Sequence, residues 1–487
     1  MASPHGSREK LAPAKGEWGN EVNMSMYPVM SSAATDECAV YPDGVTLAPE
    51  PGTVQEKPKK ARRHKGPEFY KPFHYLLLVY LFFYCSRIPE LVPWFHIGLL
   101  LQPILLVGMV MTGTTKTIFR TDVGRMMTAF TIWITISVPF STWRGGSFNV
   151  WLLAVQALAL LFFMASFIRT LEDCYRVMYT MALAGAAVGV LSFLIGGVTA
   201  AGSDRLGLGN SNDTLRDANL LALYLVTGLP FLYFASTWKK GFVKIGLIVM
   251  ILPVLAGMAK TGSRMGMLAV ALGLLFFLIH ATASQRAFVI FGGFVFLFLA
   301  VALLPHNITE RFTILFQPAS KASEEAAESS EARKTMLLRS IEMTFEHPLL
   351  GVGPGEFMDA EAAEDMAVGK RGLWHYTHNA YTELSSETGI LGMVLFLIAF
   401  WRCFRGLTPL RKRFPIVLVR RAALCIQIAI LVSAVGAFFL SIAYSGILYP
   451  IMGISAAFQL AAARRQKEMK AEAEAAPPGQ SLQGATA

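Results

Sequence analysis

Long apolar blocks separated by polar connections fill most of the chain after residue 70. Each block approaches the ~20 residues that an α-helix needs to cross a bilayer. The pattern therefore predicts an all-α polytopic membrane bundle of about twelve helices. The blocks lie at roughly 73–88, 91–111, 124–140, 148–168, 175–198, 218–237, 242–259, 264–280, 286–304, 380–401, 416–440 and 442–461.

Lysine and arginine residues gather in every second connection between these blocks. Such connections stay on the cytoplasmic side of a membrane, so the predicted orientation places both chain ends in the cytoplasm. The connection after the tenth block is the most basic. The residues behind this orientation are Lys116, Arg120, Arg125, Arg169, Arg176, Lys239, Lys240, Lys244, Arg286, Arg402, Arg405, Arg411, Lys412, Arg413, Arg420, Arg421, Arg464, Arg465, Lys467 and Lys470.

A long polar loop separates the ninth and tenth blocks and falls on the opposite, outer side. Its middle, Ser320–Met343, predicts a helical segment, and residues 356–367 predict a second short helix. Pro348 and the run Gly351–Gly355 interrupt the helical pattern between them. We therefore expect a helical loop that covers the outer ends of the bundle.

The two ends of the chain are polar and lack hydrophobic periodicity, which predicts disordered cytoplasmic tails. The first tail ends in a basic run that favours anionic lipid headgroups: Lys57, Lys59, Lys60, Arg62, Arg63 and Lys65. The predicted organisation is 1–70 (tail), 71–304 (helices one to nine), 305–378 (outer loop), 379–463 (helices ten to twelve) and 464–487 (tail).

Composition agrees with a membrane protein, since 54% of the 487 residues are hydrophobic and 16% are charged. The net charge of +10 could indicate nucleic acid, but the basic residues lie between apolar blocks and report membrane orientation instead. None of the five cysteines has a partner at metal-ligand spacing, so neither a disulfide nor a metal site is expected.

The chain is organised around the segment from His378 to Gly392, which runs from a polar loop into an apolar block. Asn379 is a good N-cap residue for the helix that follows. His378 then lies at the positive end of the helix dipole, which disfavours imidazolium and keeps the ring able to accept a proton. Gly389 and Gly392, one turn apart, would let another helix pack closely.

Several cations accompany this histidine on the outer side, where the positive-inside rule does not expect them. One interpretation is snorkelling and pairing with carboxylates, such as Arg205 with Asp204 or Arg216 with Asp213. Taken together around one histidine, the cations favour a shared anion, and a diphosphate suits guanidinium groups. These residues are Arg205, Arg216, Lys260, Arg264, Arg333, Arg339, His375 and His378.

The long outer loop, then His378-Asn379, nine residues and Gly389-x-x-Gly392, resembles the signature of the bacterial O-antigen ligase superfamily. That superfamily also contains polysaccharide polymerases and protein O-oligosaccharyltransferases. The resemblance covers about 200–460, with one departure at Ala218, where relatives often have proline. Further stretches that carry it are Thr261-Gly262-Ser263-Arg264, Asp217-Ala218-Asn219, and Arg333 leading to His347-Pro348-Leu349-Leu350-Gly351-Val352-Gly353-Pro354-Gly355.

The resemblance implies transfer of a glycan from undecaprenyl diphosphate to an acceptor hydroxyl at the periplasmic face of the bacterial inner membrane. The acceptor would be a lipid A core sugar or a growing polysaccharide, and no metal or other cofactor is implied. His378 would be the base and Arg264 its catalytic partner at the diphosphate. The expected substrate-binding residues are Arg216, Arg333, Arg205, Arg339, Asn219, His375 and Asn379.

The sequence leaves other functions open. A repeat-unit polymerase shares the same pattern as a ligase, and protein glycosylation is a more distant member of the class. A secondary transporter with about twelve helices is a different class. Against transport, the long loop follows helix nine, no internal repeat is visible, and the charges gather at one surface. A non-catalytic assembly scaffold is a further alternative.

Overall fold

The computed structural model describes residues 68–92, 97–198, 205–209, 214–303, 321–369, 371–372 and 374–475. The predicted N-terminal tail, 1–70, lies almost wholly outside these ranges. Of the predicted C-terminal tail, residues 464–474 belong to helix α17 (Leu448–Glu474), so the expected disorder is wrong there, and residues 476–487 lie outside the described residues. The helices are α1 Lys71–Ser86, α2 Ile88–Leu91, α3 Ile97–Met111, α4 Asp122–Ser137, α5 Arg144–Phe167, α6 Leu171–Leu194, α7 Ala218–Trp238, α8 Gly241–Val249, α9 Ile251–Lys260, α10 Arg264–His280, α11 Ala283–Leu303, α13 Lys321–Glu346, α14 Phe357–Ala367, α15 Ala380–Arg413, α16 Val417–Phe439 and α17 Leu448–Glu474.

Short elements complete the described chain. The 3₁₀ turns are η1 Glu68–Tyr70, η2 Ile118–Arg120, η3 Val138–Phe140 and η4 Thr214–Arg216. Strands β1 Gly197–Val198 and β2 Leu206–Gly207 form one antiparallel pair, with Gly197 opposite Gly207. This small ribbon precedes η4 and α7 in the chain and brings Arg205 toward the start of α7.

Each of the twelve apolar blocks predicted from the sequence contains a helix. The seventh is divided into α8 and α9, and the helix of the last block begins at Leu448, not at 442. Within the described residues, seven segments are long and apolar enough to cross a membrane, and α3 and α10 are shorter apolar helices. The all-α polytopic architecture is confirmed. The exact number of spans stays a prediction.

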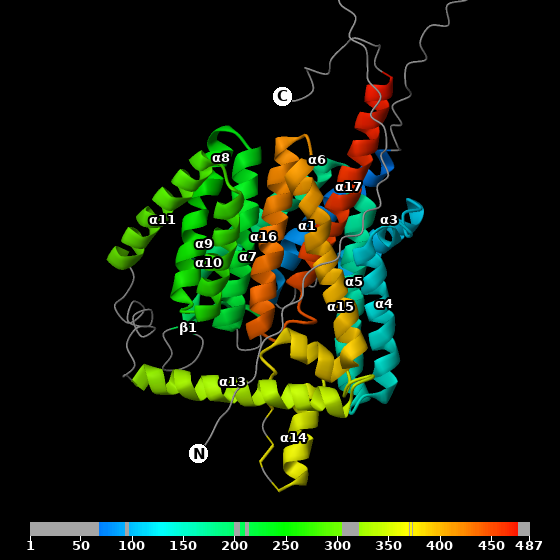
Figure 1. Cartoon of the computed structure of the whole chain (residues 1–487), viewed down its shortest axis with the longest axis vertical. Helices are drawn as coiled ribbons and strands as arrows, with labels where there is room; N and C mark the ends of the chain where they lie inside the picture. Colours follow the sequence, from blue (N-terminus) through cyan, green and yellow to red (C-terminus); the bar gives the residue numbers. More distant parts are fainter. Residues whose placement is uncertain are drawn as a thin grey trace, which may run out of the picture. The chain divides into compact units, whose positions relative to one another are not determined.

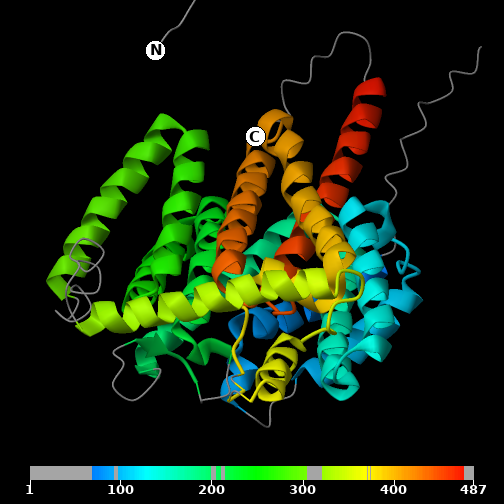
Figure 2. The ribbon, with the colours of Figure 1, turned by 60° about the horizontal axis from the view of Figure 1, so that its bottom comes forward.

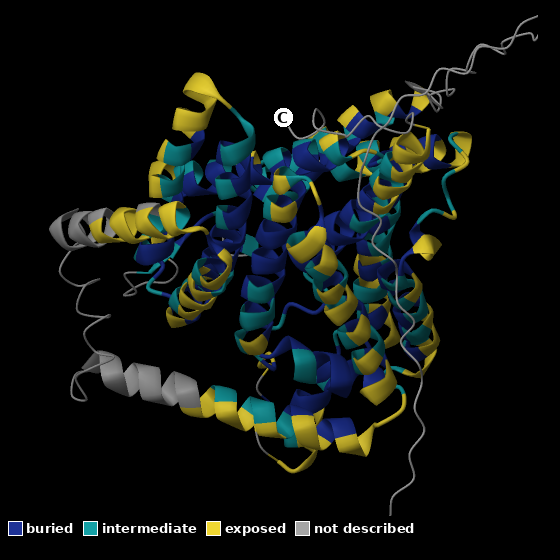
Figure 3. Ribbon diagram, turned by 45° about the horizontal axis from the view of Figure 1, so that its top comes forward, coloured by how far each residue is buried: buried dark blue, intermediate teal, exposed yellow. Residues whose placement is uncertain are grey.

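The centre of the bundle is formed by α6, α7 and α16, whose residues are mostly buried (Figure 3). Glycines allow α6 and α7 to approach closely, because a Cβ placed on Gly185 would lie 3.0 Å from the Cα of Gly228. The helices on the lipid-facing rim, such as α3 and α11, expose their apolar side chains instead. The packed centre therefore fixes where α7 and α16 place their ends.

The two helices of the outer loop lie where the sequence predicts them. Helix α13 crosses the ends of the membrane-spanning helices, and α14 lies beyond it (Figures 1 and 2). Thr344 of α13 bonds to Ser385 of α15 at 2.7 Å, which fastens the loop to the bundle. The strongly basic connection between α15 and α16 lies at the opposite end of the bundle. We refer to the end that carries α13 as the α13 face.

Helix α15 is broken at Gly389, where φ is +72° and ψ is 175°. The polypeptide after α13 enters this break: the carbonyl of Pro348 accepts from the amide of Ile390 at 2.9 Å, and the amide of Val352 donates to the carbonyl of Ser386 at 2.9 Å. The amide of Gly353 donates to the carbonyl of Glu387 at 3.1 Å. A loop therefore replaces part of the helix's own hydrogen bonding.

The break corrects the expected role of the two glycines. Gly389 does not serve helix packing, because a side chain there would overlap the carbonyl of Leu349 and adopt a left-handed backbone. Gly392 does lie against a neighbouring helix, since a Cβ there would be 3.1 Å from Trp133 of α4. The sequence spacing predicts that both glycines allow a helix to pack closely. In the structure, Gly389 accommodates the inserted loop, and Gly392 alone contacts a neighbouring helix.

Replacing Gly389 with alanine tests the insertion. We expect Gly389→Ala to lower the free energy of unfolding by about 3 kcal/mol or more, because left-handed strain adds to a backbone overlap. The measurement is thermal unfolding of the purified protein in detergent. Gly246→Ala is the matched control, because a Cβ at Gly246 meets nothing within 4 Å. Equal stability of the two variants would contradict the insertion.

Candidate functional site

Three helix N-termini carry the predicted site residues on the α13 face. Asp217 caps α7, and its carboxylate accepts from the amides of Asn219 and Leu220 at 2.9 and 2.8 Å. Ser263 caps α10, so that Arg264 is the first residue of that helix. Asn379 caps α15, as predicted, and directly follows His378. The positive ends of helices favour bound anions.

A hydrogen-bond network joins the starts of α7 and α10. Arg205 donates to Asn219 Oδ1 at 2.7 Å and to the carbonyl of Thr261 at 3.0 Å. The hydroxyl of Ser263 donates to the same Asn219 oxygen at 2.8 Å. Gly262 has φ +58° and makes the tight turn between α9 and α10. Asn219 is therefore a hub that fixes Arg264 relative to α7.

His378 is held in an unusual backbone conformation, with φ +52°. Its amide donates to Ser441 Oγ at 2.9 Å, and Thr377 bonds to the same hydroxyl at 2.8 Å. The Asn379 side chain accepts from the amides of Tyr381 and Thr382 at 2.9 and 3.2 Å. Strain of this kind gathers at functional sites when the surroundings enforce it. Here Ser441, just after α16, and the cap of α15 enforce it.

The electrostatic surroundings lower the pKa of His378 below its ordinary value. Burial is the largest cause, the positive charge of Arg333 adds to it, and Asp217 opposes it. His375 also lowers this pKa, so it too lies close to the site, although its side chain is exposed. The lowered pKa favours the neutral imidazole, and its main causes are burial and the charge of Arg333, whereas the sequence analysis considers the helix dipole.

Arg333 lies within electrostatic range of the starts of α7 and α10 as well. Burial lowers its guanidinium pKa, Asp217 raises it, and Arg264 lowers it further. The structure thus brings together His378, Arg333, Arg264 and Asp217, which we call the arginine–histidine cluster. Residues on α13, α10 and the α7 cap contribute one charge each, so the loop helix completes a site that the bundle begins.

Two other predicted arginines have different surroundings. Arg216, at the end of η4, donates to the carbonyl of Gly209 at 3.3 Å. Its suggested partner Asp213, like Asp204 for Arg205, lies outside the described residues.

Arg339 corrects an expectation. It pairs with Glu361, Glu342 and Glu346 at 2.7, 2.9 and 3.5 Å, and also with Glu364. Four carboxylates around one guanidinium leave a net negative charge, which repels a diphosphate. Arg339 therefore fastens α14 to α13 and does not join the arginine–histidine cluster.

Sequence reasoning assigned no role to two further groups. Asp217 affects the pKa of both His378 and Arg333, and its position beside Arg216 at a helix start could have indicated this. Ser441 holds the amide of His378, but it is 63 residues away in the chain, and no local pattern marks it. Within the described residues, no group of three or more His, Cys, Asp or Glu side chains could hold a metal ion.

Comparison with protein families indicates the function of the part of the chain that contains most of this cluster. Residues 248–397 match the family model described as O-antigen ligase. This part of the chain is an O-antigen ligase domain. The matched range contains Arg264, Arg333 and His378, whereas Arg205, Arg216 and Asn219 precede it. The O-antigen ligase domain indicates a glycan transferase of the ligase or polymerase type in a multi-pass membrane protein.

Two other comparisons add little to the O-antigen ligase assignment. A search of curated proteins found no significant match. A solved structure described as "Structural coordination of polymerization and crosslinking by a peptidoglycan synthase complex" is similar with a TM-score of 0.40 and 13% sequence identity. The similarity covers 70% of this chain and 97% of that chain.

The assignment of Arg339 as a brace can be tested by stability. We expect Arg339→Gln to lower the free energy of unfolding by about 1–3 kcal/mol, because four carboxylates lose their common counter-charge. Proteolysis between α13 and α14 should also become faster. Lys334→Gln removes an exposed positive charge from the same helix and should change neither quantity. A stable, protease-resistant Arg339→Gln protein would refute the brace.

Proposed function

We propose that this protein moves a glycan from undecaprenyl diphosphate to an acceptor hydroxyl at the periplasmic face of the bacterial inner membrane. The observation that carries the proposal is the convergence of three residues: His378 and Arg264, each at a helix N-terminus, and Arg333 from the middle of α13. A neutral base beside concentrated positive charge suits a displacement in which a proton leaves one substrate and negative charge grows on the other.

In the proposed reaction, an imidazole nitrogen of His378 takes the proton of the acceptor hydroxyl. The acceptor oxygen forms its bond to the anomeric carbon as the bond from that carbon to the phosphate oxygen breaks. The diphosphate leaves with the electron pair, and a single displacement inverts the anomeric centre. Arg264 and Arg333 stabilise the departing charge, with Arg216 and Arg205 as further contacts to the donor.

The pKa of His378 suits this role in a specific way. A base with a lowered pKa is a weaker proton acceptor, but it is unprotonated and available throughout the neutral pH range. Binding of a diphosphate would bring negative charge beside Arg333 and raise the pKa of His378 toward its ordinary value. The donor would therefore increase the basicity of the group that activates the acceptor.

Removing the base is the direct test. With purified protein, lipid-diphosphate glycan and acceptor, transfer should proceed without ATP or added metal. His378→Ala should reduce the turnover rate by about 10²–10⁴-fold, the usual contribution of a general base. His347→Ala, which changes an exposed histidine of the same loop, should keep full activity. Undiminished transfer by His378→Ala would remove the proposed base.

The pH dependence of transfer provides a second test. The catalytic efficiency should rise with pH as His378 loses its proton, with a midpoint below about 6.5. Arg333→Gln removes a positive charge that disfavours imidazolium, so the midpoint should move to higher pH. Asp217→Asn removes an opposing negative charge and should move it to lower pH. Identical midpoints in all three proteins would contradict the electrostatic arrangement.

The acceptor separates a ligase from a repeat-unit polymerase. A deletion strain examined on a lipopolysaccharide gel gives the distinction. Loss of every core-attached repeat indicates a ligase, whereas one remaining attached repeat indicates a polymerase. Unchanged lipopolysaccharide together with lost capsule or exopolysaccharide also favours a polymerase.

A further inference from the structure

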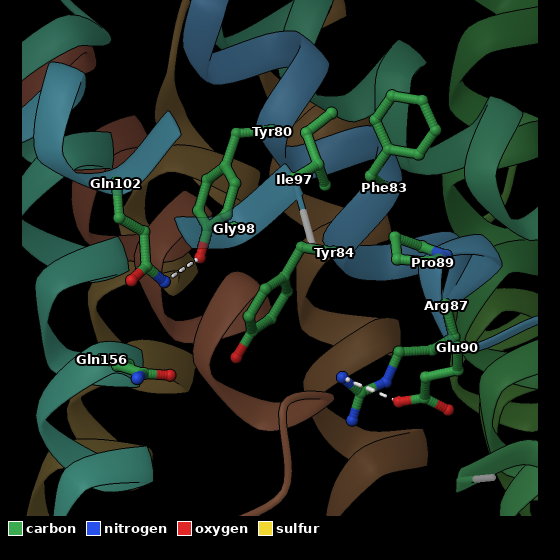
Figure 4. A pocket seen from close by; sticks show the side chains of 10 residues that line it. All are labelled: Tyr80, Phe83, Tyr84, Arg87, Pro89, Glu90, Ile97, Gly98, Gln102 and Gln156. Atoms are coloured by element: carbon green, nitrogen blue, oxygen red, sulfur yellow. Dashed lines mark hydrogen bonds and ion pairs between the residues drawn. The ribbon is translucent and has the colours of Figure 1, made fainter. Parts of the chain in front are cut away.

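A second site lies between α1, α2, α3 and α5 (Figure 4). Its cavity has a volume of about 390 Å³, within the range typical of small-molecule sites. Its polar lining comes from Tyr80, Tyr84, Arg87, Glu90, Gln102 and Gln156. We call this space the glutamine cavity. Gln156 lies twelve residues into α5, which corresponds to about 18 Å of helix, so the cavity reaches the middle of this candidate membrane span.

Some of the polar groups in the glutamine cavity have protein partners and others do not. Gln102 Nε2 donates to the Tyr80 hydroxyl at 2.6 Å, and Arg87 pairs with Glu90 at 3.3 Å. The Tyr84 hydroxyl points into the space between Gln156 and the Arg87–Glu90 pair (Figure 4). Neither Tyr84 nor Gln156 has a side-chain hydrogen bond to any described residue. Both groups face the cavity, so they are available to hydrogen-bond a polar ligand bound there.

The charge of the glutamine cavity excludes a diphosphate as that ligand. Arg87 and Glu90 neutralise each other, and the remaining lining residues are uncharged. Amide and phenol groups both donate and accept hydrogen bonds, and the tyrosine rings offer apolar faces. A sugar ring presents the complementary groups, because hydroxyls project from its edge and C–H bonds lie on its faces. The cavity therefore suits a neutral polyhydroxy ligand.

Two contacts connect the glutamine cavity with the arginine–histidine cluster. The Glu90 carboxylate accepts from the amide and the hydroxyl of Thr214 at 2.9 and 2.8 Å, and Thr214 begins the turn that precedes Asp217. Tyr84 lies against Gly446, where a Cβ would be 3.0 Å from its hydroxyl. Gly446 belongs to the segment between α16 and α17 that also contains Ser441, the partner of His378.

We propose that the glutamine cavity binds a neutral sugar ring, while the arginine–histidine cluster holds the diphosphate. The source of the sugar, donor glycan or acceptor glycan, rests on the proposed transferase function. The preference of the cavity for a sugar does not rest on it.

Photolabelling tests the ligand class without requiring transfer. Full-length protein in lipid nanodiscs is labelled with hexyl β-glucoside carrying a diazirine in its chain, and separately with hexanol carrying the same diazirine. The glucoside should preferentially label the peptides that contain Gln102 and Gln156. Excess methyl β-glucoside should compete, and inorganic diphosphate should not. Equal labelling by the alcohol, or competition by diphosphate, would overturn the proposal.

Matched variants locate the binding. Gln156→Leu and Gln102→Leu should each weaken glucoside affinity about fivefold, the loss expected for one hydrogen bond. Gln285→Leu is the control, because Gln285 also bonds to a tyrosine hydroxyl, at 2.8 Å to Tyr233, but lies outside the cavity. Unchanged glucoside affinity in both cavity variants would overturn the assignment.

Transfer kinetics identify the source of the sugar. A higher KM for the acceptor in Gln156→Leu, with kcat unchanged, assigns the glutamine cavity to the acceptor glycan. A higher KM for the lipid-diphosphate glycan assigns it to the donor. Unchanged KM values for both substrates would overturn its place in the reaction. Specific glucoside labelling of a protein that transfers no glycan would instead refute the proposed function and leave the sugar site standing.

Discussion

Repulsion between like charges is the constraint that the rest of the site depends on. Arg264 and Arg333 lie within electrostatic range of each other, and Arg333 and His375 both disfavour a charge on His378. Asp217 offsets part of this repulsion. The repulsion that Asp217 does not offset must be balanced by contacts that do not themselves depend on charge. The neutral hydrogen bonds from Ser263 to Asn219 and from the His378 amide to Ser441 fill that role, because they fix the helix starts whatever ion is present.

The break in α15 determines the distance between the loop and the bundle. Arg333 belongs to α13, whereas His378 precedes α15, so their relation depends on how α13 is attached. The segment after α13 bonds to the backbone of Ser386, Glu387 and Ile390 on both sides of Gly389. The Glu387 carboxylate also accepts from the amide of Gly355 at 2.8 Å. The loop helix is thus anchored within about three helical turns of His378, and it is not a loosely hinged cover.

The sequence predicts the helices well because length and apolar character alone determine them. Each predicted block contains a helix, and Asn379 is a helix cap, since capping depends on neighbouring residues. The role of Gly389 could not be predicted, because a glycine that packs and a glycine that bends the backbone look alike. Arg339 was misplaced for a similar reason: its carboxylate partners on α14 come together only after the chain folds. The glutamine cavity draws on four helices and has no local signal.

Depth in the membrane explains why the two sites differ in charge. An ion is stabilised at helix ends, where water and backbone dipoles are available, and the arginine–histidine cluster lies at such ends. Farther along α5, near Gln156, an unpaired charge would be costly, and the cavity lining there is uncharged, whereas Arg87 pairs with Glu90 at the end of α1. Amides and phenols tolerate that depth once they find hydrogen-bonding partners. A substrate that carries both a diphosphate and neutral sugars would therefore bind with its diphosphate in the arginine–histidine cluster and a sugar in the glutamine cavity. Each part of the substrate is stable only where the protein offers matching groups.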